Sequence, residues 1–286
     1  MDLSADEIQR AVRAALAEDI GPGDVTTLAT VPESATTRAE MVAREPLVLA
    51  GLAFAEAAFR ELKHELVITP HAADGSQCAK GQVLLHVTGS ARAILTAERV
   101  ALNLVQRLSG VATLTAQFVE QVQGTQAKIL DTRKTTPGWR RFEKYAVKCG
   151  GGTNHRVGLF DLVLIKDNHL AALRHELPNA IAAAVQRARS AYPELKVEVE
   201  ADTLEQVRQA VETRADIILL DNMSLENLRA AVALVGGRAQ TEASGGVNLQ
   251  TVRAIAETGV DFISVGAITH SARAVDVALD FDTDVA

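Results

Sequence analysis

Cysteine is scarce in this sequence, where Cys78 and Cys149 are the only two and lie far apart. Two such residues cannot build the disulfide framework of a small secreted protein, and no group of cysteines and histidines has the spacing of a zinc site. Runs of 18 or more apolar residues are also missing, and residues 1–20 predict an acidic amphipathic helix instead of a basic leader. We therefore expect a chain with no membrane segment, located in the reducing cytoplasm.

Positive charge is in deficit, since 29 Lys and Arg residues face 36 Asp and Glu residues and the formal net charge is −7. A protein that binds the phosphates of nucleic acid needs a basic surface, so we expect no nucleic-acid partner. One segment is the exception, because eight basic and two acidic residues lie between Arg133 and Lys166. A small anion is the expected ligand there. Four of these basic residues have helical spacing and could instead form a solvated helix face: Arg140, Arg141, Lys144 and Lys148.

The second half of the chain repeats one unit, a short apolar run followed by an amphipathic helix. This pattern predicts strands at 128–132, 161–169, 196–202, 215–222, 239–246 and 260–267, and the longest helical pattern between them covers 170–192. Such alternation predicts parallel strands with crossover helices, in either a β/α barrel or a doubly wound sheet. There is room for six or seven units over residues 113–286, fewer than a full barrel needs. We therefore expect an α/β protein with an incomplete or irregular β/α barrel.

The first part of the chain has a different pattern. After residues 38–51, residues 54–63 indicate a helix, and residues 65–91 indicate antiparallel strands punctuated by glycines. We predict an N-terminal α+β domain over residues 1–112, onto which the C-terminal tail 270–286 could pack. A long helical pattern from about Ala91 to Val122 joins the two domains, with an interruption expected at Ser109-Gly110.

Charged residues and glycines follow the predicted strands at their carboxyl ends, where sites form in parallel α/β folds. Lys134 and Lys166 could neutralise phosphates, whereas Arg133 and Arg156 could hold carboxylates through paired hydrogen bonds. Further along the chain, the strand ends carry two carboxylates and then small residues: Glu200, Asp221, Ser244, Gly245 and Gly266.

Each of these features also has a structural alternative. Ser244-Gly245-Gly246 before a helix, with Gly266 after the last strand, offers N–H groups to a phosphate, but a glycine pair is also a common turn. Glu200 and Asp221 could hold Mg²⁺ through water and substrate oxygens, or could cap a helix or pair with a lysine. His155, next to three consecutive glycines, is either a ligand-binding or a structural histidine.

Five motifs closely resemble a known family: DTRKTTPGWRRFEKYAVKCGGGTNHRVGLFDLVLIKDNH (131–169), VEVEADTLEQ (197–206), ADIILLDNM (215–223), ASGGVN (243–248) and TGVDFISVGAITHSAR (258–273). The family is that of the decarboxylating quinolinate phosphoribosyltransferases, also called nicotinate-nucleotide pyrophosphorylases. GPGDVTT (21–27) and ERVALNLVQRLSGVAT (98–113) match as well, so the resemblance covers essentially the whole chain.

The resemblance implies an enzyme of de novo NAD biosynthesis. Quinolinate and phosphoribosyl pyrophosphate would be its substrates, Mg²⁺ its cofactor, and nicotinate mononucleotide, pyrophosphate and CO₂ its products. It also implies a homodimer with shared sites, in which Arg99 enters the site of the neighbouring subunit. Lys134, Glu200 and Asp221 would be the catalytic residues.

By the same resemblance, the site residues fall into three groups. One would surround the two carboxylates of quinolinate: Arg99, Arg133, Lys134, His155 and Arg156. A second would act on phosphate oxygens, Mg²⁺, ribose and pyrophosphate: Lys134, Lys166, Glu200 and Asp221. The third would hold the 5′-phosphate: Ser244, Gly245 and Gly266.

Two other functions compete with this one. A related phosphoribosyltransferase could use nicotinate without decarboxylation, but a single carboxylate needs fewer cations than Arg99, Arg133 and Arg156 supply together. A non-catalytic sugar-phosphate-binding barrel would be expected to lose its Mg²⁺-handling carboxylates first, and Glu200 and Asp221 are both in place.

Overall fold

The computed structural model describes residues 2–282, which divide into two compact units. The first unit comprises the chain up to Ala116, Arg141–Gly151 and the chain from Ser271, and the second comprises Gln117–Arg140 and Gly152–His270. The predicted domains, 1–112 and 113–286, differ from this division in that the first unit extends to Ala116 and also includes Arg141–Gly151 and the chain from Ser271. Residues 283–286 of the predicted C-terminal tail lie outside the described residues.

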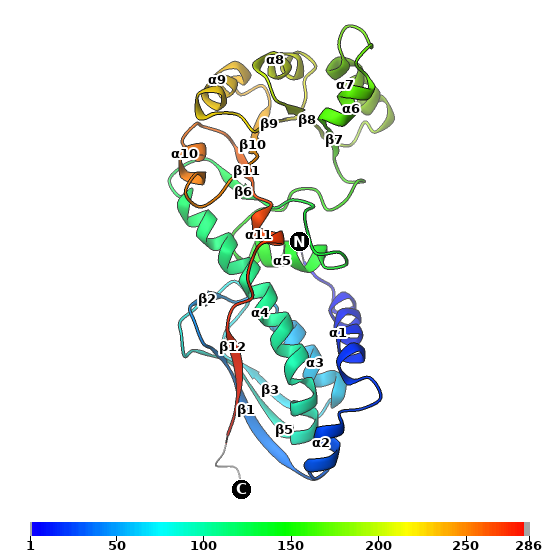
Figure 1. The fold of residues 1–286 in the computed structure, drawn as a ribbon, viewed down its shortest axis with the longest axis vertical. Helices are drawn as coiled ribbons and strands as arrows, with labels where there is room; N and C mark the ends of the chain where they lie inside the picture. The colour runs from blue at the N-terminus through cyan, green and yellow to red at the C-terminus, as the bar shows by residue number, and fades with distance from the viewer. Residues whose placement is uncertain (1, 283–286) are drawn as a thin grey trace. The chain divides into compact units, whose positions relative to one another are not determined.

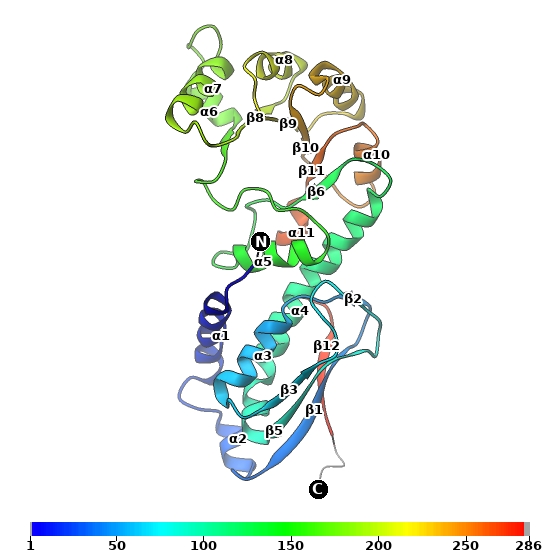
Figure 2. The ribbon, with the colours of Figure 1, turned by 180° about the vertical axis from the view of Figure 1, so that it is seen from behind.

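Four antiparallel strands form the main sheet of the first unit, of which the sequence predicted the antiparallel arrangement but not the C-terminal strand. Their order is β12 (Val277–Phe281), β1 (Thr36–Ala43), β5 (Val83–Ser90) and β3 (Val67–Pro70), and a short pair joins β2 (Leu47–Val48) to β4 (Gln77–Cys78). Helices α3 (Leu52–Leu62) and α4 (Ala91–Gln121) cover one face of the sheet (Figures 1 and 2). Alternate residues of the strands, such as Met41 and Leu85, are buried against them. The C-terminal segment therefore completes the N-terminal sheet.

The interruption predicted in the long helix is wrong, because α4 is continuous through Ser109 and Gly110. The Ser109 hydroxyl accepts a hydrogen bond from the Ala50 N–H at 3.0 Å and donates one to the Ala50 carbonyl at 3.1 Å. At Gly110 an added Cβ would lie 1.9 Å from the backbone oxygen of Arg273. Both residues thus serve close contacts of the helix instead of ending it. None of the helices in residues 2–282 combines the length and apolar character needed to span a membrane.

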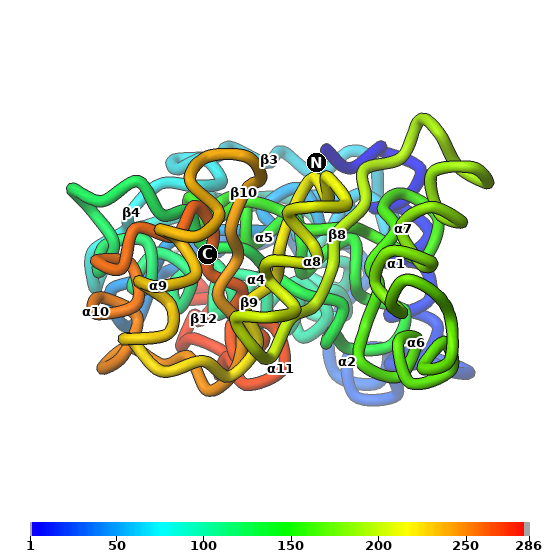
Figure 3. Tube along the Cα trace, turned by 90° about the horizontal axis from the view of Figure 1, so that it is seen from above, coloured from blue at the N-terminus to red at the C-terminus, as the bar shows by residue number. Residues whose placement is uncertain are grey.

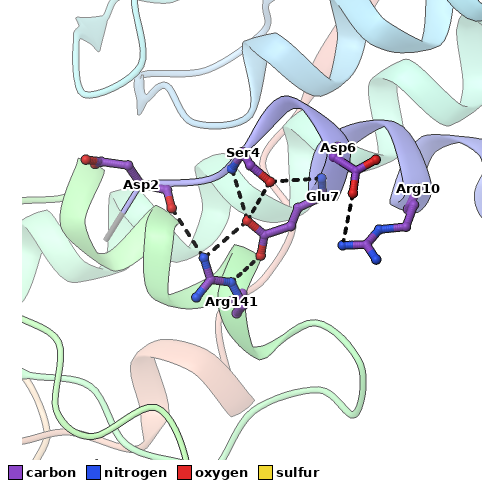
Figure 4. A network of polar contacts seen from close by, with 6 residues as sticks. All are labelled: Asp2, Ser4, Asp6, Glu7, Arg10 and Arg141. Atoms are coloured by element: carbon purple, nitrogen blue, oxygen red, sulfur yellow. Dashed lines mark hydrogen bonds and ion pairs between the residues drawn. The ribbon is translucent and has the colours of Figure 1, made fainter.

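Helix α1 (Ala5–Ile20) begins with a capping box between Ser4 and Glu7. The Arg141 guanidinium donates hydrogen bonds to both carboxylate oxygens of Glu7 and to the backbone oxygen of Asp2 (Figure 4). The short helix α2 (Val25–Thr30) follows, capped by the side chain of Asp24. The start of the chain is in this way tied to a helix more than a hundred residues further along.

That helix is α5 (Arg140–Cys149), and only part of the solvated face that its spacing allowed is present, because Arg141 and Lys148 are exposed whereas Lys144 is not. Lys144 is fully buried, and the Lys148 ammonium lies 3.0 Å from the Asp2 carboxylate. The buried Glu143 pairs with Arg107 of α4 at 2.8 Å. These contacts give the physical reason why Arg141–Gly151 belongs to the first unit.

Six parallel strands form the sheet of the second unit, in the order β6 (Lys128–Leu130), β11 (Phe262–Ser264), β10 (Gln240–Ser244), β9 (Ile217–Asp221), β8 (Val197–Ala201) and β7 (Val163–Ile165). Each strand lies within its predicted range. The strands follow an arc in Figures 1 and 2, with β6 and β7 at the two edges of the sheet. The predicted incomplete barrel is confirmed, with six strands.

Crossover helices follow the strands of this unit: α6 (Asp167–Ala172), α7 (Ala180–Ala191), α8 (Leu204–Glu212), α9 (Leu225–Val235), α10 (Val252–Ala256) and α11 (Ala267–His270). Figure 3 shows α7 to α10 side by side in chain order along the outside of the sheet. The single helix predicted over 170–192 is in fact two, because Pro178 disfavours helical backbone at Leu177 and Asn179 caps the new helix α7.

Candidate active site

The carboxyl ends of the six strands lie at one edge of the sheet, because all six are parallel. This edge carries ten of the eleven predicted site residues, those of the second unit: Arg133, Lys134, His155, Arg156, Lys166, Glu200, Asp221, Ser244, Gly245 and Gly266. Arg99, the eleventh, lies on α4 in the first unit. Contacts within this edge bring several of these side chains together, and they also involve residues that the sequence did not mark out.

Three carboxylates come together after β8 and β9. The side chains of Glu200, Asp202 and Asp221 each place an oxygen within 4.8 Å of the others. Although Asp202 is largely exposed, partial desolvation first, and then the negative charges of Asp221 and Asp167, raise its pKa. Mutual repulsion among hard oxygen donors is the condition that a divalent cation relieves, so the cluster fits Mg²⁺. Asp202 was missed because it stands one residue beyond β8, where a carboxylate also suits the turn before a helix.

Glu200 also pairs with a lysine, so its two predicted roles, binding Mg²⁺ and pairing with a lysine, are compatible. Its Oε2 lies 3.3 Å from the ammonium nitrogen of Lys166, which is about half exposed. The carboxylate itself is almost buried. Lys166 is thus held next to the carboxylate cluster, with room to reach a further anion.

Two arginines with the same charge lie close together on the loops after β6 and before β7. The Arg133 Nε is buried and finds no hydrogen-bond acceptor among the described residues. Burial, followed by the positive charge of Arg133, lowers the pKa of Arg156, whose guanidinium donates one bond to the Leu162 carbonyl at 3.3 Å. A buried donor without an acceptor, beside a second guanidinium, is an arrangement that an anionic ligand would stabilise.

Arg140 links these two loops. Its Nε donates to the Thr135 hydroxyl at 3.1 Å, and its other nitrogens donate to the backbone oxygens of Val157 at 3.2 Å and Arg133 at 3.5 Å. From its spacing alone, Arg140 could equally have been part of a solvated helix face. The Pro-Gly turn just before it, which begins the helix inside the basic segment, was the available signal.

His155 is held by three carboxylates. Its backbone N–H donates to the Asp131 Oδ1 at 2.9 Å, and its ring Nε2 lies 2.9 Å from Glu198 Oε2 and 3.5 Å from Glu242 Oε2. Burial by itself would lower the pKa of His155, but the hydrogen bonds and charges of Glu198 and Glu242 outweigh it and raise the pKa to about 10. Burial, followed by the charge of Glu242, also raises the pKa of Glu198, so the His155 and glutamate cluster retains a proton at neutral pH, and the contacts with both carboxylates favour its place on the imidazole.

Glycines permit two close approaches at this edge. A Cβ on Gly266 would lie 3.1 Å from the Lys134 Cδ and 3.2 Å from the His270 ring, so both side chains pass over the end of β11. Gly245 has φ +97°, and a Cβ there would come 2.1 Å from the Asn222 Oδ1. His270 was missed because it follows the last predicted strand by several residues. Its position one helical turn after Gly266 was the only signal.

The fold and these strand ends define a β/α-barrel domain of the kind that carries its active site at the carboxyl ends of the strands. Comparison with known proteins gives the particular family. The family model described as the C-terminal domain of quinolinate phosphoribosyl transferase matches residues 111–280, and that of the N-terminal domain matches residues 24–109.

Individual relatives agree along nearly the whole chain. The carboxylating nicotinate-nucleotide pyrophosphorylase of Mycobacterium leprae is 45% identical, with 98% of this chain and 99% of the relative covered. A probable enzyme of the same name from Bacillus subtilis is 43% identical, with 92% and 89% covered. The solved structure of the nicotinate-nucleotide pyrophosphorylase of Francisella tularensis is 42% identical and matches with a TM-score of 0.92 over 98% of both chains. The chain belongs to the quinolinate phosphoribosyl transferase family.

Proposed function

We propose that this chain converts quinolinate and phosphoribosyl pyrophosphate to nicotinate mononucleotide, pyrophosphate and CO₂, as a step of NAD biosynthesis. The observation that carries the proposal is the division of one sheet edge into a cationic part, around Arg133, His155 and Arg156, and a carboxylate part, around Glu200 and Asp221. A dicarboxylate fits the first part and a metal-bound pyrophosphate fits the second. The names of the relatives support the same activity.

The cationic part would bind quinolinate. Arg133 and Arg156 each offer two parallel N–H groups to a carboxylate, and His155 adds a fixed positive charge. Lys134 lies over Gly266 and can approach from the other side. Nicotinate, with a single carboxylate, would leave part of this charge unpaired in a half-buried site, which is the physical reason to prefer the diacid.

The carboxylate part would hold the second substrate. Glu200, Asp221 and the neighbouring Asp202 would hold Mg²⁺ and the ribose hydroxyls, and Mg²⁺ when bound supplies positive charge that offsets the pyrophosphate. Lys134 and Lys166 would contact phosphate oxygens. Ser244, Gly245 and Gly266 would receive the 5′-phosphate at the ends of β10 and β11, where backbone N–H groups are available.

The chemistry asks these residues mainly to place and neutralise two anions. With the ring nitrogen of quinolinate held against the anomeric carbon, pyrophosphate leaves while the carbon takes on oxocarbenium character. The new N–C bond makes the ring nitrogen positive. Loss of the adjacent carboxylate as CO₂ then leaves a carbanion stabilised by that nitrogen, and a proton completes nicotinate mononucleotide.

An assay of both small products tests this activity. Purified protein with Mg²⁺, phosphoribosyl pyrophosphate and carboxyl-labelled quinolinate should release CO₂ and pyrophosphate in equal amounts. Pyrophosphate release with nicotinate and without CO₂ would support the non-decarboxylating alternative. Release of neither product, from folded protein with either acid, would support a non-catalytic barrel.

Arg99 is best explained by a two-fold dimer with shared sites. Its side chain is exposed on α4 and makes no hydrogen bond or ion pair with any residue in the range 2–282. We propose that it enters the site of the neighbouring subunit. A cytoplasmic location likewise stays a prediction, supported by the two unpaired cysteines.

Mixed dimers test the shared site. Arg99→Ala and Lys134→Ala should each be nearly inactive, but dimers of the two, refolded together, contain one site with both groups intact. Random pairing should restore about a quarter of wild-type activity. The matched control pairs Arg133→Ala with Lys134→Ala, where each site keeps one lesion and no recovery is expected. Equal inactivity of both mixtures, with mixed dimers verified by mass spectrometry, would refute the arrangement.

A further inference from the structure

Two glutamates lie inside the barrel beneath the cationic part of the site. Glu198 on β8 has no exposed surface and Glu242 on β10 is 1% exposed, with β9 between the two strands. Carboxylates are rarely buried this completely without a partner, since removing one from water costs several kcal/mol. The activity proposed above gives neither of them a task.

Their contacts converge on one ring. The Nε2 of His155 is 2.9 Å from Glu198 and 3.5 Å from Glu242. The buried Oε1 of Glu198 has no hydrogen-bond partner among the described residues, and the buried Oε2 of Glu242 has only the 3.5 Å ion-pair contact with the His155 ring. Two carboxylates thus lie against one imidazole, with fewer hydrogen bonds than buried carboxylates with a purely structural role normally make. Their main effect in this arrangement is therefore electrostatic, and it acts on the His155 ring.

We propose that Glu198 and Glu242 are positioning residues, which hold the His155 imidazole in one orientation and as a cation facing the carboxylates of the substrate. The proposal rests on the function proposed above, in which His155 contacts quinolinate. Asp131 fixes the backbone of His155 from the loop after β6, so the ring is held from the backbone side and from the Nε2 side. Neither glutamate needs to touch the substrate.

The charge of the ring depends on these two carboxylates. The charged groups around it are Glu198 on β8, Glu242 on β10, Asp131 after β6, and the guanidiniums of Arg133 and Arg156, the latter near enough to interact with Glu198. With both glutamates ionised or sharing a proton, the pKa of His155 is raised and the ring stays protonated through neutral pH. Without their charges, burial acts alone and lowers the pKa. The ring would then be neutral at about pH 6.5 and above, and would gain a proton only at lower pH.

Kinetics of isosteric variants test this role. In Glu198→Gln, Glu242→Gln and the double variant, the KM for quinolinate at pH 8 should rise by about tenfold or more and should fall again only when the pH is lowered below about 6. The KM for phosphoribosyl pyrophosphate should stay within twofold. Glu143→Gln is the matched control, because Glu143 is equally buried but pairs with Arg107 in the first unit, so both KM values should remain as in wild type.

A direct measurement separates failure of this proposal from failure of the proposed function. Nitrogen NMR of protein with labelled histidine, with His155 assigned through His155→Gln, should show the ring protonated from pH 6 to pH 9 in wild type and neutral from about pH 6.5 to pH 9 in the double variant. This holds whether or not the protein turns over quinolinate. A neutral His155 in wild type would overturn the proposal, as would a KM rise that is independent of pH or equal for both substrates. A stoichiometric metal ion found by mass spectrometry in wild type and lost in the double variant would also overturn it.

Discussion

Asp202→Asn removes one of the three carboxylates that converge after β8 and β9, with little change in side-chain volume. For unit charges 4 Å apart, Coulomb's law gives about 1 kcal/mol in water and about 4 kcal/mol in a partly buried setting. Asp202 is exposed, so the energy for water, about 1 kcal/mol, applies. Because Mg²⁺ carries two positive charges, its attraction to the Asp202 carboxylate is about twice this energy. The loss should be about 2 kcal/mol, or about 30-fold in Mg²⁺ affinity.

The assay is the Mg²⁺ concentration for half-maximal pyrophosphate release, measured with saturating quinolinate. The KM for quinolinate should be unchanged in Asp202→Asn, because its carboxylates bind at the other part of the edge. Glu205→Gln, an exposed carboxylate three residues further on that pairs with Arg208, should leave the Mg²⁺ dependence as it is in wild type. A shift of less than threefold in Asp202→Asn, or an equal shift in both variants, would refute the assignment of Asp202 to the metal.

The same variant should have the opposite effect on stability. Since the pKa of Asp202 is raised in the folded protein, its ionisation costs stability, and this cost grows as the pH rises through that pKa. Without Mg²⁺, Asp202→Asn should therefore have a higher Tm than wild type at pH 7, and the difference should vanish near pH 3, where the carboxyl is protonated in both states. A lower Tm at pH 7 would contradict the repulsion inferred for this cluster.

Three further predictions concern single residues. Arg133→Ala or Arg156→Ala should lower kcat/KM for quinolinate by on the order of 10²-fold, about 3 kcal/mol, and activity within threefold of wild type in both would rule out carboxylate binding by these arginines. Arg140→Lys keeps the charge, but a lysine cannot reach Thr135, Val157 and the Arg133 backbone together. The kcat/KM should therefore fall by about tenfold at unchanged Tm. An unaltered rate would show that the two loops hold their positions without Arg140. Gly110→Ala should gain about 1 kcal/mol of helix propensity but lose roughly 3 kcal/mol through overlap with the Arg273 backbone, so urea unfolding should show net destabilisation and a more stable variant would contradict the close contact.

The architecture of the second unit was predictable because its strands are short apolar runs between turn residues, a local signal. β9, for example, ends at Asp221 within the predicted range 215–222, and the parallel arrangement follows from the helix after each strand. Residues that act by meeting across strands carry no such signal. Asp202 and His270 were missed for this reason, since each is ordinary in its own segment and becomes notable only beside Asp221 or Lys134.

Burial of polar residues was the other limit of prediction. Lys144 lies at helical spacing among basic residues, a pattern that normally marks a solvated face, yet it is fully buried. Ser109-Gly110 reads locally as a helix break, yet the hydroxyl and the missing Cβ serve tertiary contacts. In each case a contact with a residue far away in the sequence outweighed the local preference. The periodicity of the sequence predicts secondary structure but not such tertiary contacts.

The first unit is assembled from three separate stretches of chain, and its last strand, β12, hydrogen-bonds along β1. During synthesis β1 leaves the ribosome more than two hundred residues before its neighbour, so its outer edge stays unpaired while the whole barrel unit is made. Such an edge is a template for pairing with another chain, and in a crowded nascent population it is a point of exposure to chaperones and to aggregation. A stop codon just before Val277 would therefore damage the beginning of the protein, although every residue there had been made correctly.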